Sequence, residues 1–481
     1  MKLRKFETQV QHIKYKVLKE IARLAWKGDL IHHITDIPKT IVPGKQPSMR
    51  CCVYKERAIV AERVKTAMGG TRENSNVIEV MDIACDECPV SGYKVTDNCR
   101  GCIAHSCEQA CPVGAITFDE NLKSHIDKSK CIECGACAKA CPYSAILNIR
   151  RPCETACKIG AIHRGADDSA EIDNSKCTAC GACMYSCPFG AIVDKSYILD
   201  VIDFIKSSDN GKKYTVYAVV APSIAGQFSY AKTGQVITAI KMLGFNRIVE
   251  AALGADMVSL KEAKELSETD KAFITSSCCP AFVSYIEKYF PDLEGNVSRN
   301  LSPAAEIARF IRNSDPTSKI VFIGPCTAKK MEYRTESVRH YIDCVITFEE
   351  LQALIYSRDI EISELAESKF DGASSFGRRF AASGGVTAAI RRGLQEQNLN
   401  TDFNPTTCNG IDECRIALLK ASKGILKSNF IEGMACGGGC IGGAGCLTHH
   451  GDRDRRSVDA YAAEAGELSM TEAENAANEN L

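Results

Sequence analysis

The spacing of apolar residues near the start of the chain indicates a helix. Five of them recur three or four positions apart, and they are Val10, Ile13, Val17, Ile21 and Leu24. This spacing is typical of one face of a helix. A helix packed on its neighbours is favoured over a membrane or partner helix. Residues 1–80 are therefore expected to form an N-terminal helical region, whose role the pattern leaves open.

The second half of the chain alternates short apolar runs with helical stretches. The apolar runs are 215–220, 272–274 and 320–323, and the helical stretches include 236–243, 304–311 and 385–394. Short apolar strands between helices indicate an α/β domain with parallel strands. A motif rich in Pro, Ser or Cys follows each run, and ligands bind at the carboxyl ends of parallel strands. We therefore expect a domain over 196–451 with a site at these strand ends.

The last segment, 452–481, is rich in Ala, Glu and Asn. It is expected to be a solvated tail with a helix over 459–467.

Residues 81–195 contain 16 of the 27 cysteines of the chain, in an internal repeat. The unit is Cys-x-x-x-Cys, followed by Pro or Lys and then an Ala-Ile pair. Two copies extend to Cys-x-x-Cys-x-x-Cys-x-x-x-Cys-Pro, beginning at Cys131 and Cys177. This is the run of bacterial two-cluster ferredoxins, whose fourth Cys ligates the other cluster. The region is therefore expected to be an α+β, polyferredoxin-like domain with accessory 4Fe-4S clusters rather than a set of zinc sites.

The repeat spacing divides these 16 thiols into four sets. The sets are Cys99, Cys102, Cys107 with Cys141; Cys131, Cys134, Cys137 with Cys111; Cys177, Cys180, Cys183 with Cys157; and Cys153, Cys187 with Cys85 and Cys88. Each set would hold one cubane. Three clusters are the alternative, if Cys85 and Cys88 serve another purpose.

The composition narrows the functional classes. The 481 residues suffice for two to four domains, and the net charge of −1 favours neither nucleic acid nor an acidic membrane as a partner. No apolar stretch is long enough to span a bilayer, and the N-terminus lacks the apolar core of a signal peptide. A cytoplasmic location is therefore expected. There, an odd number of cysteines favours metal ligation over disulfides. Cys51 and Cys52 are adjacent and without a partner motif, so we expect buried thiols, with a redox or metal role as the alternative.

Three cysteine motifs in the second half carry the most specific chemistry. They read Thr-Ser-Ser-Cys-Cys-Pro at 275–280, Gly-Pro-Cys-Thr-Ala-Lys-Lys-Met-Glu at 324–332 and Glu-Gly-Met-Ala-Cys-Gly-Gly-Gly-Cys-Ile-Gly-Gly-Ala-Gly at 432–445. Each places one or two thiols on a turn rich in Gly, Pro or Ser. Only a folded domain could bring them to one site, and thiolates are the usual ligands of iron–sulfur clusters.

In their order and internal spacing, these motifs resemble the three signature motifs of the iron-only (FeFe) hydrogenases. Residues 81–195 resemble the accessory-cluster domain of that family, and the shortened motifs are most similar to a divergent, group B-like clostridial branch. The resemblance implies a two-lobed α/β catalytic domain and a cytoplasmic enzyme that interconverts protons and electrons with dihydrogen. Ferredoxin or flavodoxin would exchange the electrons.

The resemblance also implies the cofactors. These are a 4Fe-4S cubane linked to a two-iron unit with CO, cyanide and azadithiolate, and three to four accessory 4Fe-4S clusters. Maturation proteins would insert the two-iron unit. The implied cubane ligands are Cys279, Cys326, Cys436 and Cys440. Cys440 would also bind the two-iron unit, whereas Cys278 would stay free and pass protons to the bridge amine. The residues alone do not decide between Cys278 and Cys279, and the resemblance does.

Other positions match residues that surround the two-iron unit in the family. Lys329 matches a lysine that binds one cyanide, although without the motif it would be interpreted as a surface lysine. Pro222 and Ser223 match a loop that holds the other cyanide, and Met434 matches a packing residue. Glu332 would orient its own loop through hydrogen bonds.

A proton path is implied through Cys278, Glu262, Ser298 and Glu265, with Thr269 where the family has Arg. Glu262 and Glu265 would share a helix face, and a solvated charged face is an equal alternative.

Two positions depart from the family, since Gly324 replaces Met and Ala304 replaces Gln. Because of these departures, efficient turnover is less expected than cluster binding.

Two other functions are open within the family: a hydrogen sensor, and a non-catalytic iron–sulfur assembly protein that never takes up the two-iron unit. The sensor usually carries an added signalling domain, which no segment of the sequence indicates.

Overall fold

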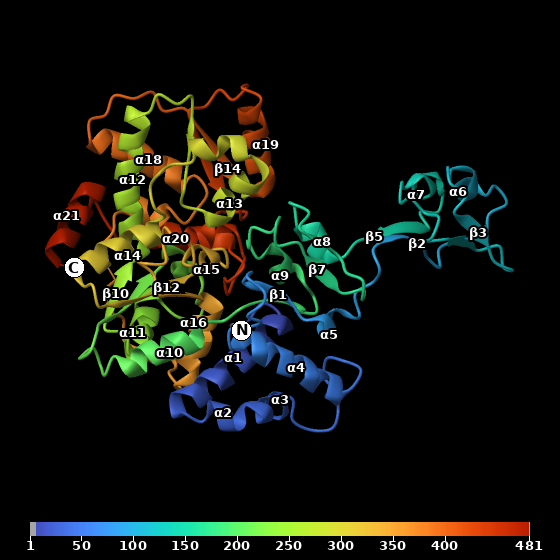
Figure 1. Cartoon of the computed structure of the whole chain (residues 1–481), viewed down its shortest axis with the longest axis horizontal. Coiled ribbons are helices and arrows are strands. Elements are labelled where there is room, and N and C mark those ends of the chain that lie inside the picture. The colour runs from blue at the N-terminus through green and yellow to red at the C-terminus, as the bar shows by residue number, and fades with distance from the viewer. Residues whose placement is uncertain (1–5, 371, 481) are drawn as a thin grey trace.

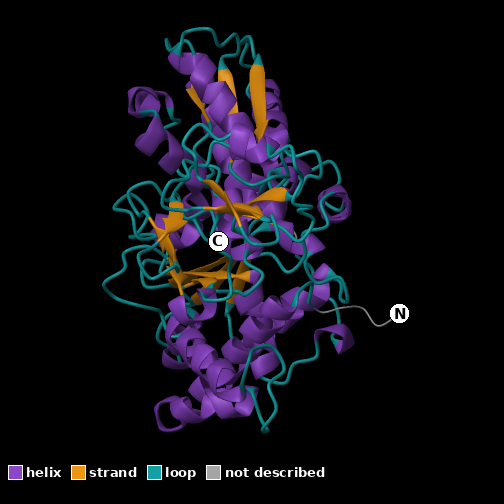
Figure 2. Ribbon diagram, turned by 90° about the vertical axis from the view of Figure 1, so that its right-hand side faces the viewer, coloured by secondary structure: helices purple, strands orange, loops and turns teal. Residues whose placement is uncertain are grey.

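The computed structural model describes residues 6–370 and 372–480. Its main body contains two parallel sheets, and the N-terminal helices pack against one end of this body (Figure 1). A cysteine-rich region lies at the side of the body and extends into a projecting arm that carries α6, α7 and β3. In the perpendicular view of Figure 2, helices flank the strands on both sides.

The two sheets of the body are parallel throughout. The first has the order β10-β9-β12-β13, with β9 Val216–Val220, β10 Arg247–Glu250, β12 Lys319–Gly324 and β13 Cys344–Thr347. The second has the order β11-β15-β14, with β11 Ile274–Thr275, β14 Pro405–Asn409 and β15 Phe430–Met434. Every residue of β9 and β15 is buried, which explains the continuous apolar run of β9. The predicted two-lobed α/β fold is confirmed.

Helices cover both sheets, and the three predicted stretches all fall within helices. The larger ones are α10 Ile198–Ser207, α11 Thr233–Leu243, α12 Ala251–Glu268, α13 Pro280–Tyr289, α14 Pro303–Ser314, α16 Phe348–Ser357, α18 Gly385–Glu396 and α19 Ile411–Ser422. The start of α14 illustrates how the sequence begins one of these helices. Ser302 caps it by accepting a hydrogen bond from the Ala305 N–H at 3.5 Å, and Pro303 occupies its first turn. The short elements between them are η2 Pro222–Gly226, η3 Pro291–Asn296, α15 Lys329–Glu332, η4 Ile362–Glu364, α17 Ser375–Arg379 and η5 Cys440–Gly442.

The cysteine-rich region repeats one structural unit, a short helix followed by a strand. The helices are α5 Asp82–Cys85, α6 Ser106–Gln109, α7 Ala136–Ala140, α8 Pro152–Ala156 and α9 Ala182–Ser186. The antiparallel strand pairs are β1 Ile78–Val80 with β8 Ile192–Asp194, β2 Gly92–Val95 with β5 Ile146–Ile149, β3 Ile116–Phe118 with β4 Ser124–Ile126, and β6 Ile162–Arg164 with β7 Ala170–Ile172.

The Ala-Ile pair of the repeat has a structural reason. Its Ile begins the strand, and its Ala donates a backbone N–H to the second Cys of the unit. These bonds are Ala115 to Cys111 at 3.2 Å, Ala145 to Cys141 at 3.4 Å, Ala161 to Cys157 at 3.2 Å and Ala191 to Cys187 at 3.3 Å. Each donor favours negative charge on the sulfur it faces.

The predicted N-terminal helix is present as α1, Gln9–Lys27, and is followed by α2 Leu30–His33, η1 Ile34–Asp36, α3 Ile37–Ile41 and α4 Val53–Ala67. Val17, Ile21 and Leu24 are buried on one face of α1, which packs against α4, α10 and α16. Gly28 ends the helix with a φ of 84°, in the left-handed region that favours glycine.

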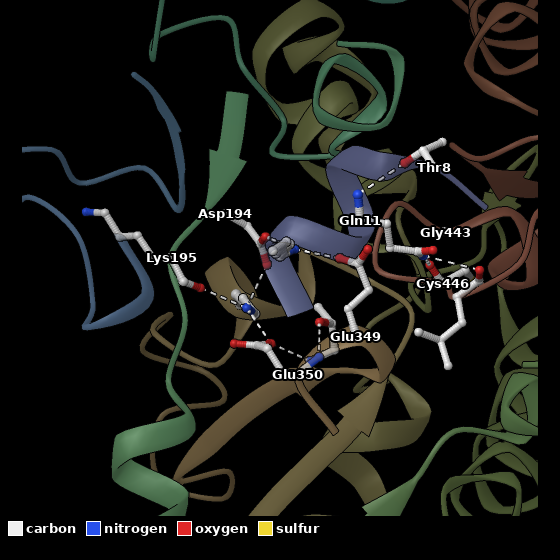
Figure 3. Close-up of polar contacts among 12 residues, drawn as sticks. Thr8, Gln11, Asp194, Lys195, Glu349, Glu350, Gly443 and Cys446 are labelled. Carbon is white, nitrogen blue, oxygen red and sulfur yellow. Dashed lines mark hydrogen bonds and ion pairs between the residues drawn. The ribbon is translucent and has the colours of Figure 1, made fainter. Parts of the chain in front are cut away.

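A buried ion network joins α1 to the rest of the molecule (Figure 3). Lys14 Nζ lies 2.5 Å from Asp194 Oδ1 and 2.5 Å from Glu349 Oε2. Lys330 Nζ lies 2.8 Å from Asp194 Oδ2 and 2.7 Å from Glu350 Oε2. Asp194 ends β8 of the cysteine-rich region, and Lys330 belongs to the second cysteine motif. The network therefore links the N-terminal helices, the cysteine-rich region and the body.

The expectation about the last segment of the chain is wrong. Segment 452–481 is not a solvated tail, because α20, Asp452–Ala463, packs on η2 and α17, and α21, Met470–Asn480, packs on α12. Val458, Tyr461 and Met470 are buried there, and the Tyr461 hydroxyl donates to Glu250 Oε2 at 2.6 Å. These side chains hold the segment to the body despite its polar composition.

Cys51 and Cys52 are not buried thiols. Cys51 is exposed and Cys52 is half-buried. Cys52 Sγ accepts a hydrogen bond from the Lys55 N–H at 3.4 Å at the start of α4, where a side-chain acceptor satisfies a free backbone donor.

No helix among the described residues is both long and apolar enough to cross a membrane.

Candidate active site

The three cysteine motifs meet at one cavity of about 90 Å³. They follow β11, β12 and β15, so both sheets contribute to its walls. Five thiols line it: Cys278, Cys279, Cys326, Cys436 and Cys440. Apart from these, the walls are mainly Ala, Pro, Gly, Phe and Met, with Ser223 and Lys329 as the polar side chains. The sequence prediction that distant motifs converge at the carboxyl ends of the strands is confirmed.

The local backbone explains how the thiols reach the cavity. Cys279 caps α13, with Pro280 in the first helical turn, and the positive end of the helix dipole favours a thiolate there. Gly438 and Gly439 precede Cys440 with φ values of 82° and 85°. A Cβ on Gly439 would lie 2.7 Å from the Ser383 N and 2.8 Å from the Ala381 O. Only glycine permits this turn.

The adjacent cysteines Cys278 and Cys279 differ in the charged groups that lie near them. Burial, followed by the charge of Cys279, raises the pKa of Cys326 and of Cys440 to about 12. Burial, followed by Cys326 and Cys279, likewise raises the pKa of Cys436. Cys279 thus lies near all three of these thiols.

Cys278 has an additional neighbour, Glu262. Burial, followed by the charge of Glu262 and then by those of Cys279 and Cys440, raises the pKa of Cys278. A metal cluster would have to displace protons from the buried thiols of the cavity.

Lys329 is buried and not a surface lysine. It lines the cavity from α15, and its Nζ lies 2.6 Å from Glu332 Oε2. Burial disfavours the ammonium group, but the ion pair with Glu332 outweighs it and raises the pKa of Lys329. The cation is therefore fixed at the cavity wall, and Glu332 contacts it directly rather than only orienting its loop.

The other predicted lining residues are also present. Pro222 and Ser223 line the cavity from η2, and Met434 lines it at the end of β15. The Ser223 hydroxyl is fully buried and has no hydrogen-bond partner among the described residues. A buried hydroxyl without a partner is costly, so this one is suited to a polar ligand in the cavity.

The predicted proton-path residues lie in contact. Glu262 is fully buried, and its Oε1 accepts from the Ser277 N–H and hydroxyl at 3.5 Å each. The Ser298 hydroxyl donates to Glu265 Oε2 at 2.7 Å and also interacts with Glu262. Glu265 and Thr269 are half-buried toward the end of α12.

Burial raises the pKa of Glu262 to about 8, although the hydrogen bond from Ser277 opposes this shift. The alternative of a solvated charged face is wrong for Glu262.

The sequence did not identify Phe322 as a site residue. Ala304 and Phe322 both line the cavity, and Gly324 follows Phe322 on the same face of β12. A Cβ on Gly324 would lie 2.6 Å from Cε1 of the Phe322 ring. The ring therefore takes the space that a side chain at 324 would need. The glycine at position 324 was the feature of the sequence that could have indicated the role of Phe322.

The accessory thiols are also grouped. Cys137 interacts with Cys131 and Cys111, and Cys180 with Cys177 and Cys157. Ser124 joins Cys99 and Cys107, because its N–H donates to Cys99 Sγ at 3.5 Å and Cys107 Sγ donates to its hydroxyl at 3.6 Å. The grouped residues are Cys99, Cys107, Cys111, Cys131, Cys137, Cys157, Cys177, Cys180 and Cys183. Of these, Cys99, Cys107, Cys111, Cys131 and Cys137 belong to the arm, as do Cys102, Cys134 and Cys141.

One of these groups adjoins the cavity. The Thr327 hydroxyl donates to the Ala179 carbonyl at 2.7 Å, beside Cys326. Cys157, Cys180 and Cys436 line a common second pocket.

Within the described residues, no three Cys, His, Asp or Glu side chains converge closely enough for a single metal ion. A cubane has a different requirement, because each thiolate binds a separate iron corner of the cluster.

Comparison with known families agrees with this geometry. Residues 214–444 match the family model of the iron only hydrogenase large subunit, C-terminal domain. These residues are therefore similar to an iron-only hydrogenase domain. Residues 98–145 match a 4Fe-4S dicluster domain, and residues 170–193 match a 4Fe-4S binding domain. The chain thus resembles a hydrogenase domain preceded by iron–sulfur modules.

The individual relatives include a hydrogenase and an iron–sulfur cluster assembly factor. Iron hydrogenase 1 of Clostridium pasteurianum is 30% identical over 54% of this chain, which spans 54% of that protein. Cytosolic Fe-S cluster assembly factor NAR1 of Kluyveromyces lactis is 29% identical over 32% of this chain and 35% of its own length. Among solved structures, the apo form of an FeFe hydrogenase from Chlamydomonas reinhardtii has a TM-score of 0.47 at 21% identity, covering 58% of this chain and 92% of that one. Catalytic and assembly proteins therefore both share sequence with the chain.

Proposed function

We propose that the chain is an FeFe hydrogenase that catalyses the reversible reduction of protons to dihydrogen. The observation that carries the proposal is the cavity itself, where three thiols group around Cys279 and a fifth thiol, Cys278, lies beside Glu262. A site that only held a cubane would need four thiols. The fifth, with its adjacent carboxyl group, is suited to proton transfer.

The residues of the cavity fit the cofactor of this family. Cys279, Cys326, Cys436 and Cys440 would hold the cubane, and Cys440 would also hold the two-iron unit. The free hydroxyl of Ser223 and the buried ammonium of Lys329 are donors suited to anionic groups such as cyanide. Apolar walls formed by residues such as Met434 exclude water. When bound, the group would supply the heterolytic hydrogen chemistry.

The protein itself would move the protons. Cys278 Sγ would hold the proton nearest the cavity, and Glu262 would exchange it with Ser298 and Glu265. The raised pKa of Glu262 keeps its carboxyl group able to hold a proton near neutral pH. Thr269, in place of an arginine, leaves a neutral exit near the end of the path.

The electron route would run through the accessory 4Fe-4S clusters. The group at Cys157, Cys177, Cys180 and Cys183 borders Cys436, so it would be the last before the cavity. The projecting arm carries the sets beginning at Cys99 and Cys111 and is open to a docking partner (Figure 1). A ferredoxin or flavodoxin suits such an arm, and a reducing cytoplasm suits 27 cysteines.

The domains would follow the same division: 1–80 for the N-terminal helices, 81–195 for the accessory clusters and 196–451 for the catalytic domain, extended by α20 and α21. The group B-like clostridial assignment belongs to this proposal too. It rests on the shortened motifs, with Gly324 and Ala304 in place of larger residues.

A second candidate is a non-catalytic iron–sulfur protein, favoured by the match to the assembly factor NAR1. Infrared spectra of the protein, expressed with the hydrogenase maturation proteins, separate the two. The hydrogenase proposal expects bands from CO and cyanide. A protein with full cubane content but without these bands would be the assembly-type relative, and a protein with the bands but negligible turnover would be a sensor.

A further inference from the structure

Four cysteines lie together in the structure, and no single matched family model covers all four. Cys85 and Cys88 precede both matched iron–sulfur segments, Cys153 lies between them, and Cys187 lies in the second. Cys85, Cys153 and Cys187 are buried in the same apolar core, and α8 packs against α9. The Ala170 N–H donates to Cys85 Sγ at 3.4 Å, and the Ala191 N–H donates to Cys187 Sγ at 3.3 Å. Backbone donors aimed at sulfur are typical of cluster ligands.

The four thiols also interact electrostatically. Cys88 is close enough to Cys85 and Cys187 for their charges to interact, and Cys153 is close enough to Cys187 and Cys88. Each thiol is therefore close to at least one of the others, although Cys88 and Cys153 lie on opposite sides of the arm in sequence.

The topology explains the long separation in sequence. After Cys88 the chain leaves the core of the cysteine-rich region and forms the arm. It returns to this core before Cys153. The pair β2–β5 closes the base of the arm, with Gly92 opposite Ile149. The run at Cys153 lacks the first two thiols of a complete ferredoxin run, and the Cys-x-x-Cys at Cys85 supplies two. Residues 92–149 are thus inserted into an otherwise ordinary two-cluster ferredoxin unit.

Two buried arginines flank this group. Arg151 is 1% exposed and donates to the Pro89 carbonyl at 3.1 Å and the Asp168 carbonyl at 2.5 Å. Arg63 is 6% exposed and donates to the Gly190 carbonyl at 2.8 Å. Within the described residues, Arg151 Nη1 and Arg63 Nε have no hydrogen-bond partner, and no carboxylate pairs with either side chain.

The two guanidinium groups lie near different members of the same thiol group. Arg151 is close enough to Cys88 for their charges to interact, and Arg63 is close enough to Cys187. An uncompensated buried cation is costly, and an anionic cluster held by four thiolates would compensate both.

We propose that Arg63 and Arg151 raise the reduction potential of a fourth accessory 4Fe-4S cluster held by Cys85, Cys88, Cys153 and Cys187, the ligand set that the repeat spacing predicts. The proposal deepens the proposed function and rests on it only for the role of the accessory clusters. A nearby positive charge stabilises the reduced, more negative cluster. A cluster at this site would lie between the clusters expected in the arm and the one that Cys157, Cys177, Cys180 and Cys183 would hold, where it would relay one electron at a time. Cys153 interacts with Cys183, so the two sites are neighbours.

Iron analysis tests the site. The full chain is made without the maturation proteins and reconstituted anaerobically with iron and sulfide, so the result does not depend on hydrogenase activity. The double variant Cys85→Ala, Cys88→Ala should hold about four iron atoms fewer per chain than the unaltered protein. The control Cys51→Ala, Cys52→Ala, an adjacent pair near the surface, should hold the same amount as the unaltered protein. Equal iron in the Cys85, Cys88 variant would overturn the proposed ligand set.

Redox titration tests the arginine and keeps all ligands in place. In Arg151→Gln, iron content should be unchanged, and one accessory-cluster signal in electron paramagnetic resonance should move to a more negative potential. Arg150→Gln, at the exposed neighbouring position, should leave every signal in place. A titration of Arg151→Gln identical to that of Arg150→Gln would overturn the charge effect.

Missing CO and cyanide bands in matured protein would remove the hydrogenase function. The results of the iron analysis and of the redox titration would still hold in that case.

Discussion

Cys278 and Cys279 are adjacent in sequence but have different surroundings. Cys279 caps α13 and interacts with Cys326, Cys436 and Cys440, whereas Cys278 interacts first with Glu262. In the proposed function, a step of one residue along the chain would therefore separate a cubane ligand from a proton carrier. The sequence contains both residues but not this difference in orientation.

Removing the free thiol tests its role. Cys278→Ala should retain the infrared bands of the cofactor and lose about 10²-fold or more of the hydrogen-evolution rate, because a positioned proton carrier contributes about this much. Cys344→Ala, a buried thiol of β13 that does not line the cavity, should retain full activity. Turnover by Cys278→Ala equal to that of Cys344→Ala would remove Cys278 from the proton path.

Glu262 gives a prediction about pH. Its pKa of about 8 exceeds the ordinary value of 4.5, so between these values the folded state binds a proton that the unfolded state releases. Stability therefore falls as pH rises through this window. Glu262→Gln removes this term, and its thermal midpoint should rise relative to the unaltered protein between about pH 5 and pH 8. Glu268→Gln, exposed on the same helix, should track the unaltered protein. A constant difference between Glu262→Gln and the unaltered protein across this range would contradict the raised pKa.

At the scale of elements, the repeats were predictable and the surroundings of the clusters were not. The Ala-Ile pairs mark the strands of the cysteine-rich region because each Ala must donate to a sulfur. The apolar runs before the motifs mark β9 and β12 because buried parallel strands are continuously apolar. Phe322 was missed because only packing shows that its ring occupies the space beside Gly324. The helices α20 and α21 were missed because their few apolar residues stand among many polar ones.

The N-terminal helix α1 gives the element-scale prediction. Lys14 joins it to Asp194 and Glu349 in the buried ion network. Removing one partner from such a network leaves buried charge uncompensated, which costs about 3–5 kcal/mol. Lys14→Met should therefore lower the free energy of unfolding by about this amount, measured by denaturant titration under anaerobic conditions. Lys16→Met, exposed on the same helix, should change it little. Equal losses in the two variants would refute the role of the network.

At the scale of the whole molecule, the components form a sequence from the surface to the buried cavity. The arm holds two of the thiol sets, the core of the cysteine-rich region holds the other two, and one of these borders Cys436 (Figure 1). The N-terminal helices and Lys330 fix the cysteine-rich region to the body at Asp194. In the proposed function, this arrangement would place the clusters in sequence between the arm and the cavity, and the ion network would maintain their spacing.

The central claim is that the five thiols at the cavity support hydrogen turnover. It is tested most directly by hydrogen evolution from reduced methyl viologen, measured on protein matured anaerobically and with its infrared spectrum recorded on the same sample. The account predicts sustained hydrogen production together with CO and cyanide bands. A sample that shows these bands but produces no more hydrogen than its Cys278→Ala variant would contradict it.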